Sequence, residues 1–335
     1  MEPLRVGVLG TARIAEAAIV VPAHATGTRL VAVAARDTSR SDAFAAEHGV
    51  EKAVATYADV LADPEVEAIY NPLPNGLHAP WNLAAIAAGK HVLSEKPFAA
   101  DADEAREVRD AGADAGLVVA EAFHYVHHPV TRRLHELLAS GELGELVQVE
   151  TMMREPAPPA DDPRWSLQLA GGALMDIGCY GLHAHRMLAP WAGGEPSLVT
   201  ATGGERVGLP GVDQWVDAEL SYPSGARGRA RCDMAGDSRE MSCRIVGTRG
   251  EATATQFVLS HLDDRVLVCS PAGERVEHLG TRSTYTYQLE AFGATVRRGS
   301  PFRTDGNDAV ATMTLIDRCY AAIGLDRRPR SPRIA

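Results

Sequence analysis

The sequence contains few cysteines and no long apolar run. None of its five cysteines forms a CxxC pair with another, so we expect neither a disulfide framework nor a structural zinc site. No apolar stretch reaches the roughly 18 residues that a membrane-spanning helix needs. The N-terminus lacks the basic and apolar regions of a signal peptide. We therefore expect a cytoplasmic protein with no membrane partner.

Positive charge is also scarce. The 335 residues include 33 Lys+Arg against 44 Asp+Glu, which gives a formal net charge of −11. Because phosphate backbones are bound by clustered Lys and Arg, this balance argues against a nucleic-acid partner. Apolar residues make up 45% of the chain, which is typical of globular proteins and excludes a disordered or collagen-like chain.

The first 120 residues alternate between short aliphatic runs and helical patterns. The runs are continuous, as in parallel strands buried on both faces, and they cover residues 4–9, 30–35, 68–71, 91–94 and 117–120. Helical patterns lie between them at residues 13–21, 41–48, 79–88 and 102–113. This order predicts an α/β Rossmann domain that binds a dinucleotide, which we place at residues 1–122.

The second half has a different pattern. Alternating segments separated by turn signals lie between residues 197 and 268, which predicts a large, open and mainly antiparallel sheet. A strand at 146–153 precedes them, and helical patterns occur at 129–139, after Gly172, at 287–297 and at 308–323. We place this α+β domain at residues 123–335. We expect the Arg- and Pro-rich tail after Asp326 to be loosely held.

A candidate dinucleotide-binding turn joins the first predicted strand to the first predicted helix. Its sequence is Gly10-Thr11-Ala12-Arg13-Ile14-Ala15. A tight turn at this place directs backbone N–H groups and the helix N-terminus at a pyrophosphate. Only the first glycine of the usual fingerprint is kept, since Ala12 replaces the glycine that lets the backbone approach the phosphates. A plain strand–helix turn is the alternative interpretation.

The end of the second predicted strand bears on the choice between NAD and NADP. NAD enzymes usually place a carboxylate there for the ribose hydroxyls, whereas an arginine suits the 2′-phosphate of NADP. Here Ala35 occupies the acidic position and Arg36 follows it. The sequence therefore favours NADP over NAD. In the alternative interpretation, Arg36 is a surface residue and Asp37 binds the ribose.

Two further segments follow parallel strands at the edge where open α/β sheets bind ligands. One runs from Tyr70 to His78, and the other is Glu95-Lys96-Pro97. A lysine directly after a buried strand can be partly desolvated, which lowers its pKa and suits it to proton transfer. An ordinary surface lysine is the alternative. Pro97 is compatible with a rigid or cis turn.

A third candidate segment follows Gly171 and contains Asp176, Tyr180 and His183. In a helix these three residues share one face, where a carboxylate, a phenol and an imidazole could serve acid–base chemistry. The alternative is an Asp that balances the helix dipole beside an interfacial Tyr.

Histidines cluster at His124, His127 and His128 and again at His183 and His185. No carboxylate stands at the spacing of a zinc signature, so we expect no metal site.

Taken together, four motifs in order resemble the Gfo/Idh/MocA family of oxidoreductases over nearly the whole chain. They are residues 71–78, 89–97, 121–123 and 172–180. The turn at Gly10 and the position of Tyr180 are most similar to the branch that contains dimeric dihydrodiol dehydrogenases and xylose dehydrogenases. The resemblance implies hydride transfer between a nicotinamide and a carbinol or carbonyl of a sugar, polyol or related compound. It also implies a homodimer or a dimer of dimers.

The resemblance further implies roles for individual residues. We expect Tyr180 to be the acid–base group, with Lys96 as its electrostatic partner and Asp176 orienting substrate hydroxyls; proton transfer by Lys96 itself is the alternative. Substrate contacts are expected from Phe123, Trp165 and His183. Cofactor contacts are expected from Gly10, Thr11, Ala12, Arg13, Ile14, Arg36, Asn71, Leu73, Asn75, His78, Glu95 and Lys96.

The chain departs from the branch at two positions. His124 and Val126 stand where relatives commonly have Met and Arg, so the specificity is expected to differ. Two other functions are open alternatives. One is an NAD-dependent glycosidase that retains its cofactor, and the other is a non-catalytic nucleotide sensor, for which an intact acid–base set would have no use.

Overall fold

The computed structural model describes residues 2–334, and their contacts divide the chain into two compact units. The first unit contains the residues up to Phe123, Tyr285–Ala311 and the tail from Arg330, and the second contains His124–Thr284 and Thr312–Pro329. The first division lies next to the expected boundary at residue 122. The expected single domain at 123–335 differs from this division, because two of its segments pack with the first unit.

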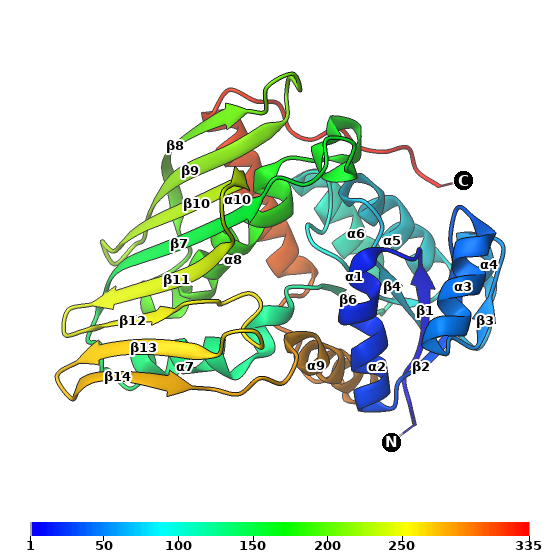
Figure 1. Cartoon of the computed structure of the whole chain (residues 1–335), viewed down its shortest axis with the longest axis horizontal. Coiled ribbons are helices and arrows are strands. Elements are labelled where there is room, and N and C mark those ends of the chain that lie inside the picture. Colours follow the sequence, from blue (N-terminus) through cyan, green and yellow to red (C-terminus); the bar gives the residue numbers. More distant parts are fainter. Residues whose placement is uncertain (1, 335) are drawn as a thin grey trace. The chain divides into compact units, whose positions relative to one another are not determined.

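The first unit is built on a six-stranded parallel sheet with the order β3-β2-β1-β4-β5-β6 (Figure 1). Its strands are β1 (Arg5–Leu9), β2 (Arg29–Ala34), β3 (Lys52–Ala53), β4 (Ala68–Asn71), β5 (His91–Ser94) and β6 (Val119–Glu121). The predicted Rossmann fold is confirmed, and the central strands are buried on both faces as their continuous aliphatic runs indicate. The sequence pattern missed β3, which is only two residues long.

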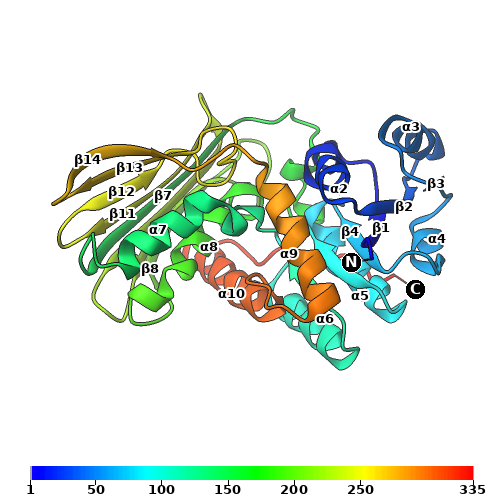
Figure 2. The same cartoon turned by 90° about the horizontal axis from the view of Figure 1, so that it is seen from below.

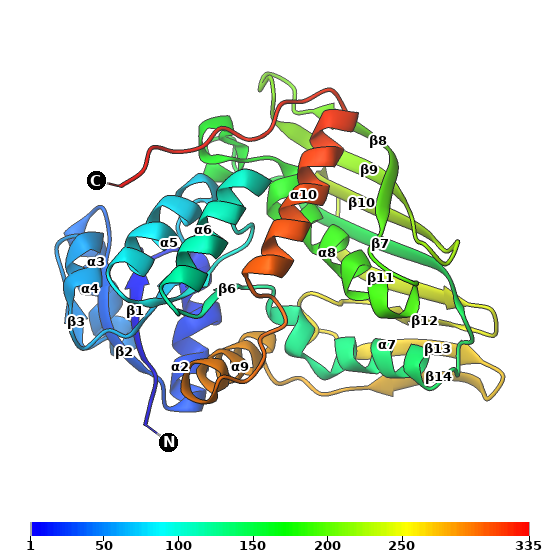
Figure 3. The same cartoon turned by 180° about the vertical axis from the view of Figure 1, so that it is seen from behind.

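Helices flank both faces of this sheet. They are α1 (Arg13–Ala15), α2 (Val21–Thr26), α3 (Thr38–His48), α4 (Tyr57–Ala62), α5 (His78–Ala87), α6 (Ala102–Asp114) and α9 (Thr284–Arg298). α1 and α2 lie on one face, and α5 and α6 lie together on the other (Figures 1 and 3). A π-helical turn, Glu16–Val20, joins α1 to α2. The first helical segment therefore continues past the predicted end at Val21 to Gly27, whose φ of 72° terminates it.

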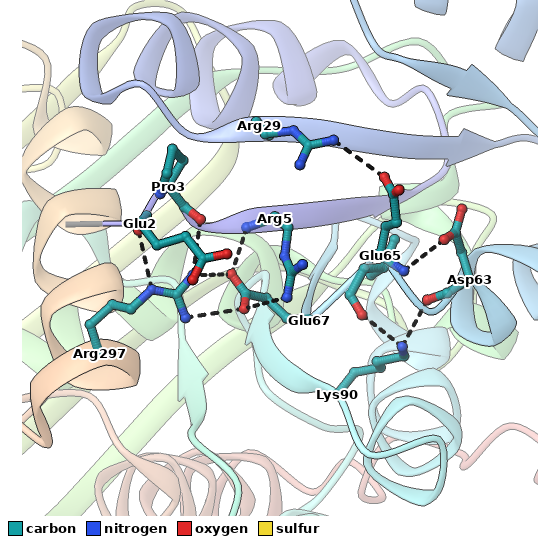
Figure 4. Close-up of polar contacts among 10 residues, drawn as sticks. Glu2, Pro3, Arg5, Arg29, Asp63, Glu65, Glu67, Lys90 and Arg297 are labelled. Carbon is teal, nitrogen blue, oxygen red and sulfur yellow. Dashed lines mark hydrogen bonds and ion pairs between the residues drawn. The ribbon is translucent and has the colours of Figure 1, made fainter.

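Contacts at the amino end of β1 explain why α9 belongs to the first unit. The guanidinium of Arg297 donates to the carbonyl of Pro3 at 2.9 Å and to Glu67 at 3.1 Å (Figure 4). Glu67 also accepts the backbone N–H of Arg5 at 2.8 Å. Farther along the chain, the hydroxyl of Thr304 donates to the carbonyl of Glu121 at 2.6 Å. These bonds join the segment to the amino ends of the central strands β1 and β4 and to the edge strand β6.

The second unit is built on an eight-stranded sheet with the order β14-β13-β12-β11-β7-β10-β9-β8. Only β10 and β7 pair in parallel; the other neighbours are antiparallel. The large, mainly antiparallel sheet is thus confirmed. Its strands are β7 (Leu146–Pro156), β8 (Ser197–Glu205), β9 (Asp213–Ser221), β10 (Arg227–Gly236), β11 (Glu240–Gly247), β12 (Glu251–Ala254), β13 (Arg265–Ser270) and β14 (Gly273–His278).

Helices cover one face of this sheet, while its other face is open (Figure 2). The helices are α7 (Pro129–Ala139), α8 (Cys179–Met187) and the part of α10 (Gly306–Ala322) that follows Ala311. Along β10 buried and exposed side chains alternate, as expected for a strand with one covered face. α8 lies against β7 and β10, and this contact positions the candidate catalytic residues.

The tail after Asp326 is anchored, which corrects the expectation that it is loosely held. Arg328 is 2% exposed, and its guanidinium lies 3.9 Å from the ring centre of Tyr320 and 3.9 Å from a carboxylate oxygen of Asp213. Arg330 binds both carboxylate oxygens of Asp101 at 2.7 Å. Each arginine thus meets a buried carboxylate that composition alone does not disclose. Over residues 2–334, no helix has the length and apolarity needed to cross a membrane.

Candidate active site

The first βα turn of the Rossmann sheet has the shape and the free polar groups of a dinucleotide site. Gly10 adopts a φ of 96°, which favours glycine, and its N–H donates to the carbonyl of Ala34 at 2.8 Å. No side chain caps the helix that follows Ala12, so its N-terminus is open to an anion. The hydroxyl of Thr11 is buried without a hydrogen-bond partner, and a phosphate oxygen would satisfy it. These residues fit a dinucleotide.

The residues after β2 distinguish the two ways of binding the adenosine ribose. The carboxylate of Asp37 caps α3, accepting from the N–H of Ser39 at 3.0 Å and from its hydroxyl at 2.7 Å. These bonds hold the pKa of Asp37 below its usual value. The side chain of Arg36 is exposed. One oxygen of this carboxylate, Oδ1, thus serves the helix cap, and the neighbouring arginine is exposed.

A second arginine and a tyrosine complete this part of the first unit. Arg40 donates from its guanidinium to the carbonyl of Thr11 at 3.1 Å. Burial raises the pKa of Tyr57, and the positive charges of Arg36 and Arg40 oppose this rise. A Cβ added at Gly10 would lie 3.7 Å from the Tyr57 hydroxyl. Tyr57 follows a strand of only two residues, and no sequence motif points to it.

The loop after β4 is held by its own side chains. The amide of Asn71 donates to the carbonyl of His78 at 3.1 Å and to the side chain of Asn82 at 2.8 Å. The ring nitrogens of His78 lie 2.6 Å from the carbonyls of Leu73 and Pro97. Burial lowers the pKa of His78 to about 4. Asn71 and His78, both expected to contact the cofactor, are therefore placed to shape the loop.

The Glu95-Lys96-Pro97 turn follows β5. Its Lys96–Pro97 peptide bond is cis, in agreement with the turn that Pro97 indicates. Glu95 is 7% exposed and accepts the phenolic O–H of Tyr70 at 2.8 Å. Burial and the charge of Glu95 raise the pKa of Tyr285 at the start of α9. Lys96 itself is half-buried.

In the second unit, Asp176 and Tyr180 lie on two different helical geometries. Residues Leu174–Gly178 form a π-helical turn that carries Asp176, and α8, which begins at Cys179, carries Tyr180. A regular helix was expected over both positions. π-helical turns often occur at functional sites, and the sequence pattern does not reveal them.

A buried carboxylate holds the start of this segment. Asp213 of β9 accepts the N–H of Leu174 at 2.6 Å and the phenolic O–H of Tyr320 at 2.9 Å. At Gly172 the φ is 127°, and an added Cβ would lie 2.0 Å from a carboxylate oxygen of Asp213. Only glycine therefore fits there. Burial raises the pKa of Asp213, while Arg328 and these hydrogen bonds oppose the rise.

Glycines also bring the segment close to the sheet, and this predicts a large effect of Gly178→Ala. The added Cβ would lie 2.7 Å from Sγ of Cys232 and 2.9 Å from Cδ1 of Leu174. We expect a loss of about 1–3 kcal/mol in the free energy of unfolding, measured by urea denaturation. Gly293→Ala in α9 is the control, since its Cβ would meet nothing within 4 Å and alanine favours helix by about 1 kcal/mol. Equal stability of the two variants would contradict the close packing.

Hydrogen-bonding groups surround the phenol of Tyr180 within the second unit. Its oxygen lies 3.3 Å from Nε2 of His124. The neighbouring Tyr125 lies with its hydroxyl 2.7 Å from Nδ1 of His183. His183 is fully buried.

Asp176 is also buried, and its carboxylate lies 3.7 Å from the guanidinium of Arg164. No sequence motif points to this contact.

The remaining expected substrate residues are buried aromatics in different units. Trp165 is 3% exposed; its indole N–H donates to the carbonyl of Pro158 at 3.3 Å, and Arg206 lies 4.1 Å above its ring centre. Phe123 ends the first segment of the first unit and is fully buried. The first unit thus contains Lys96 and all the expected cofactor residues, and the second contains Asp176 and Tyr180.

Within residues 2–334, no group of three or more His, Cys, Asp or Glu side chains is arranged to hold a metal ion.

Two family models match the chain, one for each half. Residues 4–123 match an oxidoreductase family with an NAD-binding Rossmann fold, and residues 131–253 match the GFO/IDH/MocA C-terminal domain.

Relatives of known activity match nearly the whole chain or about two thirds of it. A D-xylose 1-dehydrogenase (NADP(+)) of Haloferax volcanii is 38% identical over 330 residues, which cover 96% of this chain and 99% of that protein. A trans-1,2-dihydrobenzene-1,2-diol dehydrogenase of Oryctolagus cuniculus is 35% identical over 67% of this chain and 66% of its own.

Solved structures are similar over the whole chain. A 3-ketoreductase from Actinomadura kijaniata, in complex with NADP and TDP-benzene, superposes with a TM-score of 0.88 at 27% identity; the match covers 99% of this chain and 100% of that one. A levoglucosan dehydrogenase in complex with NADH and levoglucosan has a TM-score of 0.87 at 20% identity over 96% of this chain and 98% of its own, which shows a shared fold.

Proposed function

The chain belongs to the Gfo/Idh/MocA family of NAD(P)-dependent sugar oxidoreductases, and on this premise we propose that it uses NADP(H) to oxidise or reduce a sugar. The hydride moves between the nicotinamide and a carbinol or carbonyl carbon. The relatives described above include dehydrogenases and a ketoreductase, and both kinds of enzyme carry out this one reaction in opposite directions. The acid–base chemistry and the cofactor preference of this chain follow from its own residues.

One observation carries the preference for NADP. At the end of β2 the exposed side chain of Arg36 stands next to Asp37, whose Oδ1 accepts two hydrogen bonds from Ser39 in the cap of α3. Arg36 and Arg40 offer positive charge to a 2′-phosphate at this place. The open helix N-terminus and the unpartnered hydroxyl of Thr11 would hold the pyrophosphate. The bound cofactor would accept or supply the hydride.

The proton is handled by Tyr180. During oxidation the phenolate takes the proton of the substrate hydroxyl, and during reduction the phenol returns it to the carbonyl oxygen. A free tyrosine has a pKa of about 10 and is a poor base at neutral pH, so a nearby positive charge is needed to favour the phenolate. We assign this charge to Lys96. Asp176, oriented by Arg164, accepts hydrogen bonds from other hydroxyls of the sugar.

The remaining expected residues act as supports for this site. His78 and Asn71 fix the loop beside the Lys96–Pro97 turn, and His183 fixes Tyr125. We also propose that the protein forms a homodimer or a dimer of dimers, as its resemblance to the family implies.

A turnover assay tests the function. With NADP⁺ and a panel of pentoses and hexoses, we expect absorbance of reduced nicotinamide to grow for at least one aldose. With NADPH, the matching keto-sugar or lactone should reverse the change. NAD⁺ serves as the control and should support turnover about tenfold more weakly, as one lost charge contact of about 1.4 kcal/mol implies. Faster turnover with NAD⁺ would contradict the assignment of Arg36.

A further inference from the structure

We propose that Tyr180 exchanges its proton with solvent through a side-chain relay formed by His124, Thr284 and His261. The inference rests on the role given above to Tyr180, and it deepens that role by stating where the proton goes. All four residues belong to the second unit. They come from α8, from the segment before α7, from the start of α9 and from the loop before β13.

Consecutive contacts link the four side chains. The Tyr180 oxygen lies 3.3 Å from Nε2 of His124. On the other side of the same ring, Nδ1 of His124 lies 2.8 Å from the hydroxyl of Thr284. That hydroxyl lies 3.3 Å from Nδ1 of His261. Both nitrogens of one imidazole are therefore used, one toward the phenol and one toward the hydroxyl.

The path runs from the interior toward solvent. Thr284 is fully buried, His124 is 1% exposed and Tyr180 is 6% exposed. His261 is half-buried, so it is the residue of the four with the greatest exposure to solvent. A phenol that is buried to this extent cannot rely on bulk water for its proton, and an ordered chain of donors and acceptors provides the connection.

Every group in the path can give one proton and receive one. When Tyr180 protonates the substrate oxygen during reduction, the phenolate takes the proton from Nε2 of His124. Nδ1 of His124 then takes the hydroxyl proton of Thr284, and the Thr284 oxygen takes the proton from Nδ1 of His261. His261 regains a proton from solvent at Nε2. The net transfer is one proton from solvent to the substrate oxygen, which balances the hydride delivered to its carbon.

Burial at the outer end favours neutral rings, which such a relay requires because a neutral imidazole has one donor and one acceptor. Burial lowers the pKa of His261. His128 lies close enough to His261 to interact electrostatically, and burial lowers its own pKa to about 4. Asp264 opposes this effect on His128 and lies 2.8 Å from Nδ1 of His278.

The decisive variants are Thr284→Val and Thr284→Ser. Valine keeps the shape of threonine and removes the hydroxyl, whereas serine keeps the hydroxyl. We expect kcat of Thr284→Val to fall about tenfold or more, in the range by which positioned proton transfer contributes, with the Kd of NADPH unchanged. Thr284→Ser should stay within about threefold of the wild type.

Isotope effects separate a relay from a merely structural role. If return of the proton to Tyr180 becomes slow in Thr284→Val, the solvent deuterium kinetic isotope effect on kcat should increase. The kinetic isotope effect measured with NADPH deuterated at the nicotinamide C4 should decrease, because hydride transfer no longer limits the rate. Loss of kcat with an undiminished C4 effect, or equal loss in Thr284→Val and Thr284→Ser, would overturn the relay.

A matched pair in the same unit provides the control. The hydroxyl of Tyr222 lies 2.8 Å from Nδ1 of buried His185, so Tyr222→Phe also removes a buried Tyr–His contact. It should lower stability and leave both isotope effects at the wild-type values.

Failure of the relay is distinguishable from failure of the proposed function. An active Tyr180→Phe variant would refute the acid–base role itself, whereas an inactive Tyr180→Phe with a fully active Thr284→Val would refute only the relay.

Discussion

Tyr180→Phe is expected to lose about 10²- to 10⁴-fold in kcat while it binds NADPH as tightly as the wild type. The loss follows from removing the acid–base group, whose contribution is commonly of this size. The ring itself is kept, so its edge contacts with His124 at 5.9 Å and Tyr125 at 6.1 Å between ring centres remain. Steady-state kinetics with the best aldose from the panel gives kcat, and fluorescence titration gives the Kd.

Tyr222→Phe is the control for this experiment as well. It removes a phenolic hydroxyl of the same unit that bonds to His185. It should retain wild-type kcat. If Tyr180→Phe kept its turnover, proton transfer would have to be reassigned to Lys96. In that case Lys96→Met should show the large loss instead.

Arg36→Ala is expected to weaken NADPH binding about 10- to 100-fold and to leave NADH binding unchanged. A charged hydrogen bond to a phosphate contributes about 1.5–3 kcal/mol, and about 1.4 kcal/mol corresponds to a factor of ten in affinity. NADH has no 2′-phosphate, so it loses nothing. Titration of the intrinsic tryptophan fluorescence with each cofactor measures both constants.

Two neighbouring variants sharpen the assignment. Arg40 donates to the backbone carbonyl of Thr11, so Arg40→Ala should loosen the turn and weaken both cofactors. Asp37→Asn should keep the cap of α3, because Asn and Asp are about equally favourable at this position, and should leave NADH affinity intact. A marked loss of NADH affinity in Asp37→Asn would instead identify Asp37 as the ribose ligand.

Much of the fold could be predicted from local sequence patterns. The strands of the first unit are continuous aliphatic runs, and α7 begins and ends where its pattern indicates, at Pro129 and Ala139. The contacts that were missed depend on distant pairing. Asp213 reaches Leu174 across 39 positions, and His124 meets Thr284 across 160. No periodicity in the sequence connects such residues, because only the pairing of strands and the packing of helices bring them together.

In the candidate site, too, the positions of the main residues could be predicted from the sequence, whereas their contacts could not. The positions of Gly10, Lys96, Asp176 and Tyr180 follow from motifs at strand ends and helix starts. Their surroundings do not, because a π-helical turn at Leu174–Gly178 changes how Asp176 is presented relative to α8. The capping of α3 by Asp37 is likewise a matter of side-chain geometry. The sequence alone does not disclose this cap, which bears on the two interpretations of how the cofactor ribose is bound.

Paired titration of the purified wild-type protein with NADPH and NADH tests the central claim most directly. We expect both to quench the tryptophan fluorescence and NADPH to bind at least about tenfold more tightly, because Arg36 and Arg40 offer positive charge to its 2′-phosphate. Tighter binding of NADH would contradict the role of Arg36, after β2, as a ligand of the 2′-phosphate. Binding of neither, in protein shown to contain no retained nucleotide, would contradict the nicotinamide site itself.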